Sequence, residues 1–521
     1  MLMTQVQSLY FELTSRTPSA SKSIGYSLGI LALWKMLVVI RMHANRPKNI
    51  PIKHGSFFLG HWLFNLEFIR DAPLMVSRAY KELNNASFAI PALTEYQVLA
   101  CLESDARAVS EASEQMLSFH AAMTDRLKHK YTMFGFEHNE VDPHNAVPAR
   151  TLKVLLRKHL PDIRPIIQKR IIQVFELEFD RFPETSNGWK DISAFGLARR
   201  ITERVNTQIC LGTELAESSK FMQAARRYNH DAIVAAEICR QLPSIFTPLI
   251  APMVMNWSGA MREVGASIKE VVQARLYQQK FEAKDTLDCI QWIIQSSRTE
   301  AQRSLERLVQ QTGALFFASS HQMPMAFVYA IYSLCIYPKY IDLLRQEAAE
   351  KFNPEKKDPL KPLVLLEAFL RESARLNPLD ALSIQRKVLQ PFQLPSGARI
   401  PAGNLVAVPQ QAVLRNEHLY PEPESFNPFR YLPQDKNSQG DEPTIRYTDV
   451  TSSFPYWGST RKPCPGRWYV SETMKLAILH LITNYDIRLE GDKVPRSFFW
   501  TTALVPRMDA KILLKKLQNG L

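Results

Sequence analysis

One cysteine of this chain stands in a sequence suited to holding a reactive sulfur. Cys464 lies between Pro463 and Pro465 in the run Trp457 to Arg467, which reads WGSTRKPCPGR and carries cations on both sides of the cysteine. Such a loop can fix the sulfur, point backbone N–H groups at it and surround it with positive charge, conditions that favour a thiolate. A thiolate in an apolar, hydrogen-bonded pocket is the axial ligand that a haem iron needs for O–O bond cleavage. The alternative is an inert cysteine buried in a proline-rich turn.

Two upstream motifs supply charged residues that could support this loop. Glu372 and Arg375 stand three residues apart in a run of helical apolar spacing that ends at Pro378, so they share one helix face. Arg430 follows in the segment Phe426 to Tyr431. A surface pair contributes little to stability, whereas charges that meet in a core need mutual pairing to offset their desolvation. A Glu–Arg–Arg cluster behind the cysteine loop meets that need.

Taken in order, these motifs resemble those of a cytochrome P-450 of the membrane-bound fungal type. The resemblance covers nearly the whole chain and rests on E-x-x-R at Glu372 and Arg375, F-x-P-x-R ending at Arg430, and the C-P-G-R that begins at Cys464. It implies a mainly α fold with small β-sheets and a haem b (iron protoporphyrin IX) with a cysteine thiolate axial ligand. Cys464 is then the proximal ligand and binds the metal. Glu372, Arg375 and Arg430 are then the structural triad.

The resemblance also assigns cations to the haem propionates. Arg386 precedes a hairpin pattern with two Gly-containing turns, and Lys462 stands two residues before the cysteine. A propionate needs fixed cationic donors, although each residue could instead be a solvated surface cation. The cysteine loop departs from the family pattern, with Trp457 where phenylalanine is usual and Thr460 where glycine is usual. We expect Gly458 to relieve the turn.

A second departure falls on the helix expected over the distal haem face, within Leu305 to Tyr337. Ala318 and Ser319 match the usual small pair, but His321 stands at the acid position and Gln322 at the threonine position. In the family the threonine hydroxyl helps deliver protons, and glutamine is a poor proton carrier.

Several interpretations of this departure stay open. Ser320 or His321 could relay protons through water, or a substrate hydroxyl could replace the missing one. The enzyme could also be an isomerase or dehydratase that needs no such delivery, and Gln322 could merely shape the pocket. Pro324 lacks an N–H, which frees the carbonyl of Ser320 and predicts a local distortion of the helix.

Apolar residues near these motifs are candidates for a substrate pocket. Phe317 precedes the distal motif, and Leu379, Leu382 and Ile384 follow the E-x-x-R helix. An apolar lining predicts a lipophilic substrate. The resemblance to fungal enzymes implies secondary metabolism, with a terpenoid-like molecule as the first candidate.

Length alone would suggest about three domains, but the motifs near the C-terminus depend on a partner helix more than a hundred residues earlier, so we predict one large catalytic domain over residues 54–521. The chain has 521 residues, 46% of them hydrophobic, and no G-x-G-x-x-G motif, so electrons must come from an external flavoprotein. The resemblance names that partner as NADPH–cytochrome P-450 reductase. The net charge is +13 without a nucleic-acid motif, and basic residues near the cysteine loop could steer an acidic partner. Six widely spaced cysteines without C-x-x-C predict a reducing compartment.

The N-terminal region predicts a membrane attachment. Residues 1–23 form a tail, 24–40 an apolar anchor helix interrupted by Lys35, and 41–53 a basic, proline-containing hinge. A span needs ~20 apolar residues, so the helix could either cross the bilayer once or lie in its interface. The following cations place the catalytic domain in the cytosol, on the endoplasmic reticulum. The apolar run Leu242 to Met255 either enters the bilayer or connects helices internally.

These features together predict a membrane-anchored haem-thiolate monooxygenase that uses O₂ and electrons from NADPH. The runner-up is a haem-thiolate isomerase or dehydratase that needs no external electrons. A non-catalytic membrane protein that binds haem is the third interpretation.

Overall fold

The computed structural model describes residues 20–53, 58–92, 94–139, 141, 146–185, 187–278, 286–433, 445–491 and 497–518. Its helices are α2 (Ala20–Ala44), α3 (Phe58–Glu82), α4 (Glu103–Glu111), α5 (Phe119–Leu127), α6 (His129–Thr132), α7 (Ala146–Arg150), α8 (Leu160–Arg181), α9 (Ala194–Leu211), α10 (Thr213–Glu217), α11 (Ser219–Gln241), α12 (Thr247–Trp257), α13 (Ala260–Gln278), α14 (Cys289–Ser296), α15 (Glu300–Arg303), α16 (Leu305–Ser320), α17 (Gln322–Ile336), α18 (Lys339–Lys351), α19 (Val364–Leu376), α20 (Gln410–Val413) and α21 (Arg467–Asn484). A π-helix, η2 (Thr151–Leu156), continues α7, and the 3₁₀ turns are η3 (Ser244–Phe246), η4 (Pro428–Tyr431) and η5 (Pro455–Trp457). The mainly helical fold predicted from the sequence is confirmed.

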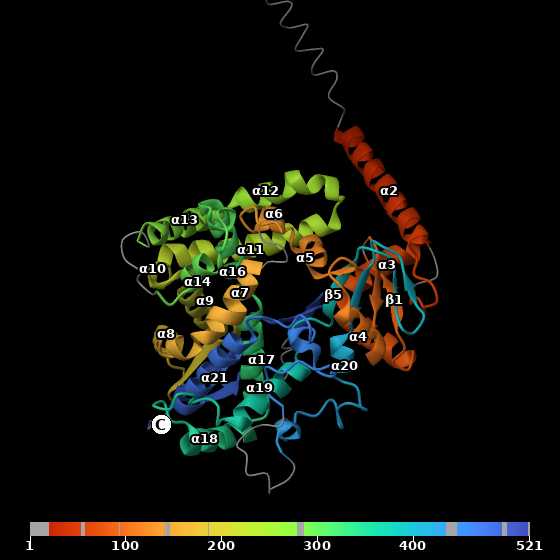
Figure 1. The fold of residues 1–521 in the computed structure, drawn as a ribbon. Helices are drawn as coiled ribbons and strands as arrows, with labels where there is room; N and C mark the ends of the chain where they lie inside the picture. The colour runs from red at the N-terminus through yellow and green to blue at the C-terminus, as the bar shows by residue number, and fades with distance from the viewer. Residues whose placement is uncertain are drawn as a thin grey trace, which may run out of the picture.

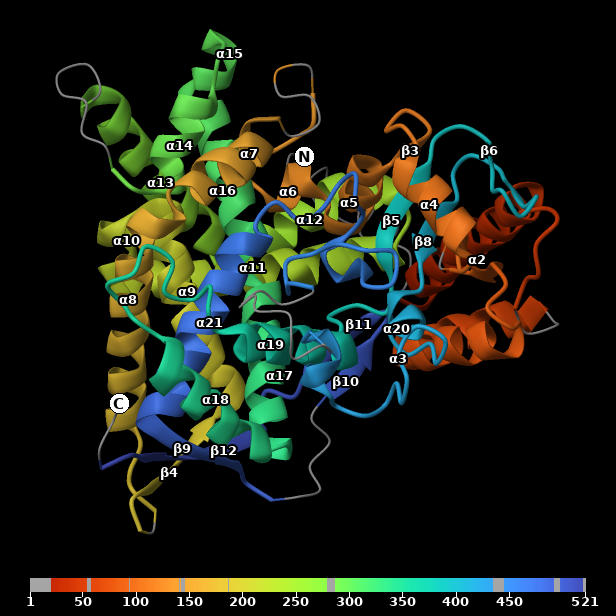
Figure 2. The same cartoon turned by 60° about the horizontal axis from the view of Figure 1, so that its bottom comes forward.

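The strands form small sheets at different places around the helices. They are β1 (Phe88–Pro91), β2 (Tyr96–Leu99), β3 (Leu117–Ser118), β4 (Trp189–Ser193), β5 (Ser383–Val388), β6 (Phe392–Gln393), β7 (Arg399–Ile400), β8 (Leu405–Val408), β9 (Tyr485–Leu489), β10 (Ser497–Trp500), β11 (Ala503–Pro506) and β12 (Lys511–Lys516). The largest sheet has the order β1-β2-β8-β5-β3, and β4-β12-β9 forms a second sheet. Figure 2 shows β5 and β8 on one side of the molecule, and β4, β9 and β12 on the other. In the largest sheet β5 pairs with β3, with Ser118 opposite Lys387.

The main hydrophobic core lies among the long helices rather than between the sheets. It joins α8, α9, α16, α17, α19 and α21, with fully buried side chains such as Ile201, Phe327 and Phe369. Figure 2 shows α17, α19 and α21 side by side at the centre of the molecule. Burying this apolar area is the dominant favourable contribution to folding, at ~25 cal/mol per Å². The core thereby fixes two helices of the predicted site: α19, which carries the E-x-x-R motif, and α21, which follows the cysteine.

The N-terminal helix α2 projects from the body in Figure 1. It runs from Ala20 to Ala44 and so extends beyond both ends of the predicted anchor, while residues 1–19 of the predicted tail lie outside the described residues. Within the described ranges, none of the helices combines the length and apolar character that a bilayer crossing requires. The predicted hinge is hydrogen-bonded to the body, since Lys48 N donates to Arg399 O at 2.9 Å and Lys53 N donates to Ala89 O at 2.9 Å.

Candidate functional site

The cysteine loop is a tight turn that closes on itself around Gly458. Gly458 has φ +93° and ψ −150°, and a Cβ at this position would lie 3.0 Å from the backbone oxygen of Lys462. Cys464 N donates to Trp457 O at 2.6 Å across the turn. The region of the Gly458 dihedrals is essentially restricted to glycine, so this residue determines the path of the loop. The departure at Thr460 is therefore accommodated two residues after a glycine that makes the turn.

Aromatic side chains pack against the cysteine loop and support it. The indole Nε1 of Trp457 donates to Tyr447 O at 2.7 Å, and the two rings meet edge-on with centroids 5.1 Å apart. Trp457 is buried, with 8% of its surface exposed. A tryptophan at this position thus covers the loop with its ring and anchors it through its indole N–H.

The environment of the Cys464 sulfur combines burial with hydrogen-bond donors. Burial raises the pKa of the thiol, while the backbone N–H groups of Gly466 and Arg467 and the Arg467 guanidinium act in the opposite direction. Arg467 also donates from Nη1 to Cys464 O at 2.8 Å. Burial outweighs the donors in the free thiol, although a residue bound to a metal ion is deprotonated outright. The loop therefore supplies the donors that a bound thiolate needs.

The three triad residues meet in one buried cluster. Arg375 makes a bidentate pair with Glu372, with Nε to Oε2 at 2.7 Å and Nη2 to Oε1 at 2.8 Å. Arg430 Nε donates to Glu372 Oε1 at 3.2 Å, and Tyr431 OH donates to Glu372 Oε2 at 3.0 Å. The side chains of Glu372 and Arg375 are fully buried. A buried ion pair of this kind offsets its desolvation cost only when the remaining polar atoms of both side chains are also hydrogen-bonded.

This cluster ties the helix α19 to the meandering segment that precedes the cysteine loop. Arg375 Nη1 donates to Leu414 O at 2.8 Å and to Pro423 O at 2.6 Å, and Nη2 donates to Ser425 O at 3.1 Å. Glu372 also accepts from Asn427 N at 2.9 Å. One arginine thus fixes three separate carbonyl groups of an otherwise irregular chain.

Arg386 and Lys462, the two predicted propionate partners, lie near a carboxylate that the sequence analysis missed. Lys462 Nζ forms an ion pair with Glu114. Arg386 is 4% exposed, donates to Gln385 O at 2.9 Å, and lies with its guanidinium 5.4 Å from the centre of the Phe119 ring. Burial lowers the pKa of Arg386, and Glu114 opposes this shift.

The strand that carries Arg386 is irregular just before it. The pairing of β5 with β8 shifts register between Ser383 and Arg386, and Ile384 has φ +51°. A positive φ is a strained conformation for a β-branched residue, and bulges of this kind redirect side chains. Because of this bulge, Arg386 does not continue the alternation of side chains that begins at Ser383.

The distal helix is interrupted at the motif itself. It is divided into α16 and α17 at His321, which has φ −105° and ψ −45°. The distortion predicted from Pro324 is confirmed. Ala318 and Gln322, one turn apart, are exposed on a helix whose neighbouring positions are mostly buried. These two residues share the face that the resemblance assigns to the haem.

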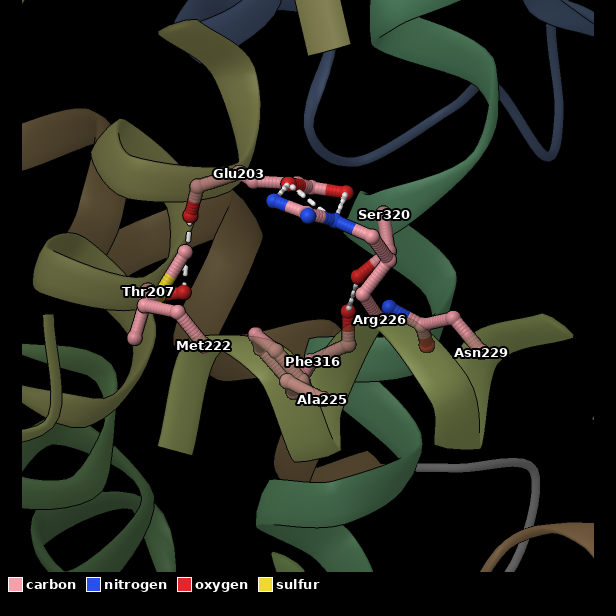
Figure 3. A pocket seen from close by; sticks show the side chains of 8 residues that line it. All are labelled: Glu203, Thr207, Met222, Ala225, Arg226, Asn229, Phe316 and Ser320. Atoms are coloured by element: carbon pink, nitrogen blue, oxygen red, sulfur yellow. Dashed lines mark hydrogen bonds and ion pairs between the residues drawn. The ribbon is translucent and has the colours of Figure 1, made fainter. Parts of the chain in front are cut away.

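Ser320 points to the opposite side of the helix. Its Oγ donates to Phe316 O at 2.7 Å, and the residue lines a small pocket between α9, α11 and α16. Figure 3 shows the lining residues, which are Glu203 and Thr207 of α9, Met222, Ala225, Arg226 and Asn229 of α11, and Phe316 and Ser320 of α16. The structure therefore does not place the Ser320 hydroxyl on the same face as Gln322.

His321 lies between these two faces. Its Nε2 is buried with no hydrogen-bond partner among the described residues, and its ring meets Phe317 edge-on at 4.8 Å between centroids. Burial lowers the pKa of His321 to about 4. The imidazole is therefore neutral at physiological pH and keeps one polar nitrogen available.

A buried amide links this interruption to the helix after the cysteine. Asn206 of α9 donates from Nδ2 to Ser319 O at 2.6 Å and accepts from Tyr469 OH of α21 at 2.8 Å. Nothing in the local sequence marks Asn206, because its partners lie more than a hundred residues away. It couples the geometry of the distal helix to that of the helix that begins at Arg467.

The predicted substrate residues are distributed over three clusters. Phe317 is 4% exposed and packs near Tyr228, and Leu379 lies at the edge of the same main core. Leu382 is buried in a second cluster under α3, and Ile384 borders a third under the large sheet. The structure thus places Phe317 and Leu379 in one core and separates Leu382 and Ile384 from it.

Comparison with known proteins agrees with this geometry. The sequence model of the family described as Cytochrome P450 matches residues 60–514. The chain belongs to this family. Members of the cytochrome P450 family are haem monooxygenases with a cysteine thiolate axial ligand, so the enzyme class and cofactor expected from the sequence are confirmed.

Individual P450 relatives are fungal and distant. Cytochrome P450 monooxygenase ltmQ of Epichloe festucae var. lolii is 25% identical over 513 residues, 92% of this chain and 94% of the relative. Cytochrome P450 monooxygenase olcJ of Penicillium canescens is 25% identical over 469 residues, 87% of this chain and 86% of the relative. Among solved structures, the cyanobacterial CYP120A1 with bound retinoic acid superposes with a TM-score of 0.69 at 18% identity and covers 90% of this chain. This last likeness supports the fold.

The side chains of this P450 fit a haem. The cysteine loop presents a sulfur with two backbone N–H donors, and the nearby Arg386 is a buried cation suited to a carboxylate. Among the residues that the structure describes, the strip at Ala318 and Gln322 gives the distal helix an exposed face. An iron porphyrin needs an axial ligand, cations for its propionates and an open distal face, and the cysteine, Arg386 and the exposed helix face meet these three needs.

Proposed function

We propose that this P450 is a membrane-associated monooxygenase that oxidises a lipophilic secondary metabolite, with a terpenoid-like molecule as the first candidate. Cys464 is the proximal iron ligand in this proposal. Two electrons from NADPH reach the protein through NADPH–cytochrome P-450 reductase. One atom of O₂ enters the substrate and the other leaves as water. The observation that carries the proposal is the cysteine loop, closed at Gly458 and supported by the Glu372 cluster.

Bound haem supplies the oxygen chemistry, and the chain supplies ligation, orientation and a dry pocket. Cys464 offers its sulfur with donors from Gly466 and Arg467 that stabilise a thiolate. Arg386 and Lys462 would hold the propionates of a bound haem. The buried triad keeps the segment before the loop in place, so that the sulfur stays at a fixed position.

Proton supply is where this chain departs most from its family. Gln322 is exposed on the distal face and can hold a water through its amide, while His321 is neutral and its buried Nε2 has no hydrogen-bond partner within the described part of the chain. A neutral imidazole can accept a proton on one nitrogen and release one from the other. We assign the relay to His321 and the positioning of water to Gln322. The hydroxyl of Ser320 faces the other side of the helix and is not needed on this route.

An electron-transfer partner with an acidic surface suits the proximal side. Lys153, Arg157 and Lys158 are exposed on and after the π-helix η2. The Arg157 guanidinium lies 4.0 Å from the centre of the Trp468 ring, which in turn lies next to Arg467 in the loop region. Positive charge that clusters beside the cysteine loop steers an acidic flavoprotein to the shortest path for electrons. This arrangement supports the reductase as partner.

Two exposed apolar surfaces support membrane association. Ile245, Leu249, Met253 and Trp257 recur every fourth residue along η3 and α12 and are 56% to 85% exposed. Leu33, Met36, Leu37 and Ile40 of α2 are likewise exposed. In Figure 1 α12 lies along the upper edge of the body, and α2 projects upward beside it.

Such apolar stripes mark membrane or protein contact. We therefore propose that both helices contact the endoplasmic reticulum membrane, with the catalytic domain in the cytosol. Because none of the described helices meets the requirements of a bilayer crossing, we propose that α2 lies in the membrane interface.

The experiment that tests the function is expression in microsomes with reductase, followed by feeding a panel of lipophilic metabolites. Product that gains one oxygen atom, depends on NADPH and is absent with Cys464→Ala supports the proposal. Product of unchanged elemental composition, formed without NADPH or reductase, indicates the isomerase alternative. A Cys101→Ala variant is the matched control, because that cysteine lies in the sheet region.

A further inference from the structure

A carboxylate lies beside the two cations assigned to the haem propionates. Glu114 belongs to the short segment between α4 and β3, and its side chain is 13% exposed. It accepts from Ser118 Oγ at 2.7 Å and from the backbone N–H of His120 at 3.0 Å, and it pairs with Lys462 Nζ. Its position is therefore fixed from three sides.

The ion pair is one of two contacts that fasten the cysteine loop to this segment. Arg461, next to Lys462, donates from Nη1 to the backbone oxygen of Glu111 at the end of α4. Lys462 N is in turn held by Ser459 Oγ at 3.0 Å. The loop that presents Cys464 is thus joined to a segment some 350 residues earlier through Arg461 and Lys462.

The charge of Glu114 persists throughout the physiological range. Burial opposes the charged form, but hydrogen bonds from Lys462, the His120 amide and Ser118 outweigh it and lower the pKa of Glu114 to about 2. Glu114 also attracts the buried guanidinium of Arg386. A permanent negative charge therefore stands among the cations that would neutralise the propionates.

The consequence follows from counting the charges. Arg386 and Lys462 can neutralise two propionates, but Glu114 already takes up one positive charge through Lys462. The negative charge of Glu114 therefore weakens the positive potential that Arg386, Lys462 and the neighbouring Arg461 would present to the propionates. A negative charge in a low-dielectric surrounding disfavours the addition of an electron to a nearby group.

We propose that Glu114 is a positioning residue that holds Lys462 on the protein and lowers the reduction potential of the haem. The step concerned is the one-electron reduction of ferric to ferrous iron. The electron comes from the reductase in the cell and from an electrode in the assay. This inference rests on the proposed haem orientation, with Arg386 and Lys462 at the propionate edge.

The test is the reduction potential of the purified holoenzyme, measured in an electrode titration that is monitored through the absorption spectrum. Glu114→Gln preserves size and keeps an acceptor for Ser118 and His120 while removing the charge. We expect its potential to rise by about the equivalent of a tenfold gain in the ferrous-to-ferric ratio, or ~59 mV for one electron. Glu111→Gln is the matched control, since it removes an exposed carboxylate three residues earlier, at the end of α4, and its shift stays below threefold.

A second variant keeps the proposal testable if Glu114→Gln folds poorly. Lys462→Gln leaves Glu114 without its cation, so the potential falls, opposite in sign to Glu114→Gln. In the double variant the two shifts are not additive, because both residues belong to one pair. Equal shifts for Glu114→Gln and Glu111→Gln, or shifts of the same sign for the two partners, overturn the proposal. Failure of the wild-type protein to bind haem, by contrast, refutes the proposed function itself.

Discussion

The turn at Gly458 offers the sharpest test of how the cysteine loop is built. Gly458→Ala places a Cβ on a backbone with φ +93° and ψ −150°, a region that costs an ordinary residue roughly 1–3 kcal/mol. The same Cβ comes within 3.0 Å of the backbone oxygen of Lys462, which cannot move without shifting the loop. We therefore expect about 3 kcal/mol of destabilisation, concentrated in the loop that presents Cys464.

Gly466→Ala is the matched control because it lies in the same loop, two residues after the cysteine. Gly466 has φ −89° and ψ 0°, and a Cβ there meets no atom within 4 Å. The assay is the carbon monoxide difference spectrum of the reduced protein, together with the rate of haem loss in denaturant. Gly458→Ala loses most of the thiolate-type band or releases haem at least tenfold faster, while Gly466→Ala behaves as wild type. Equal behaviour of the two variants refutes the assignment of the turn to Gly458.

Three further predictions concern the triad and the distal helix. Glu372→Gln breaks a fully buried bidentate pair and lowers the free energy of unfolding by about 3–5 kcal/mol in denaturant titrations. Glu424→Gln removes the exposed partner of Arg415 and changes the free energy of unfolding by less than about 1 kcal/mol. Similar losses for the two variants contradict the buried cluster. Burial lowers the pKa of His321 to about 4, so the unfolded state takes up its proton first and stability falls as the pH drops from about 6.5 to 4. His321→Gln removes that part of the fall, and parallel pH profiles of unfolding free energy speak against a buried neutral imidazole. Gln322→Thr raises the fraction of consumed NADPH recovered as product if proton delivery limits coupling, and an unchanged fraction indicates a route that bypasses position 322.

The sequence predicted the proximal half of the site better than the distal half. Cys464, Glu372, Arg375 and Arg430 stand in motifs whose spacing is fixed by one helix, one 3₁₀ turn and one loop, and the structure brings the three charged residues into contact. Packing against a common core leaves them little freedom. For the same reason the helix interruption at Pro324 could be predicted, since a missing N–H acts locally.

The distal side depends on contacts that no local pattern records. Ser320 lies two positions from both Ala318 and Gln322, and at about 100° per residue this spacing already places it on the opposite helix face. The sequence therefore already contains the geometric signal that separates Ser320 from the face of Ala318 and Gln322. Asn206 and Glu114 carry no signal of this kind, because their partners come from segments far apart in the chain.

The carbon monoxide difference spectrum of reduced Cys464→Ala tests the central assignment most directly. The wild-type protein and Cys101→Ala show the band that a thiolate-ligated haem gives, and Cys464→Ala loses it. Retention of an unchanged thiolate-type band in Cys464→Ala would show that another side chain holds the iron, and the site described around this loop would be wrong.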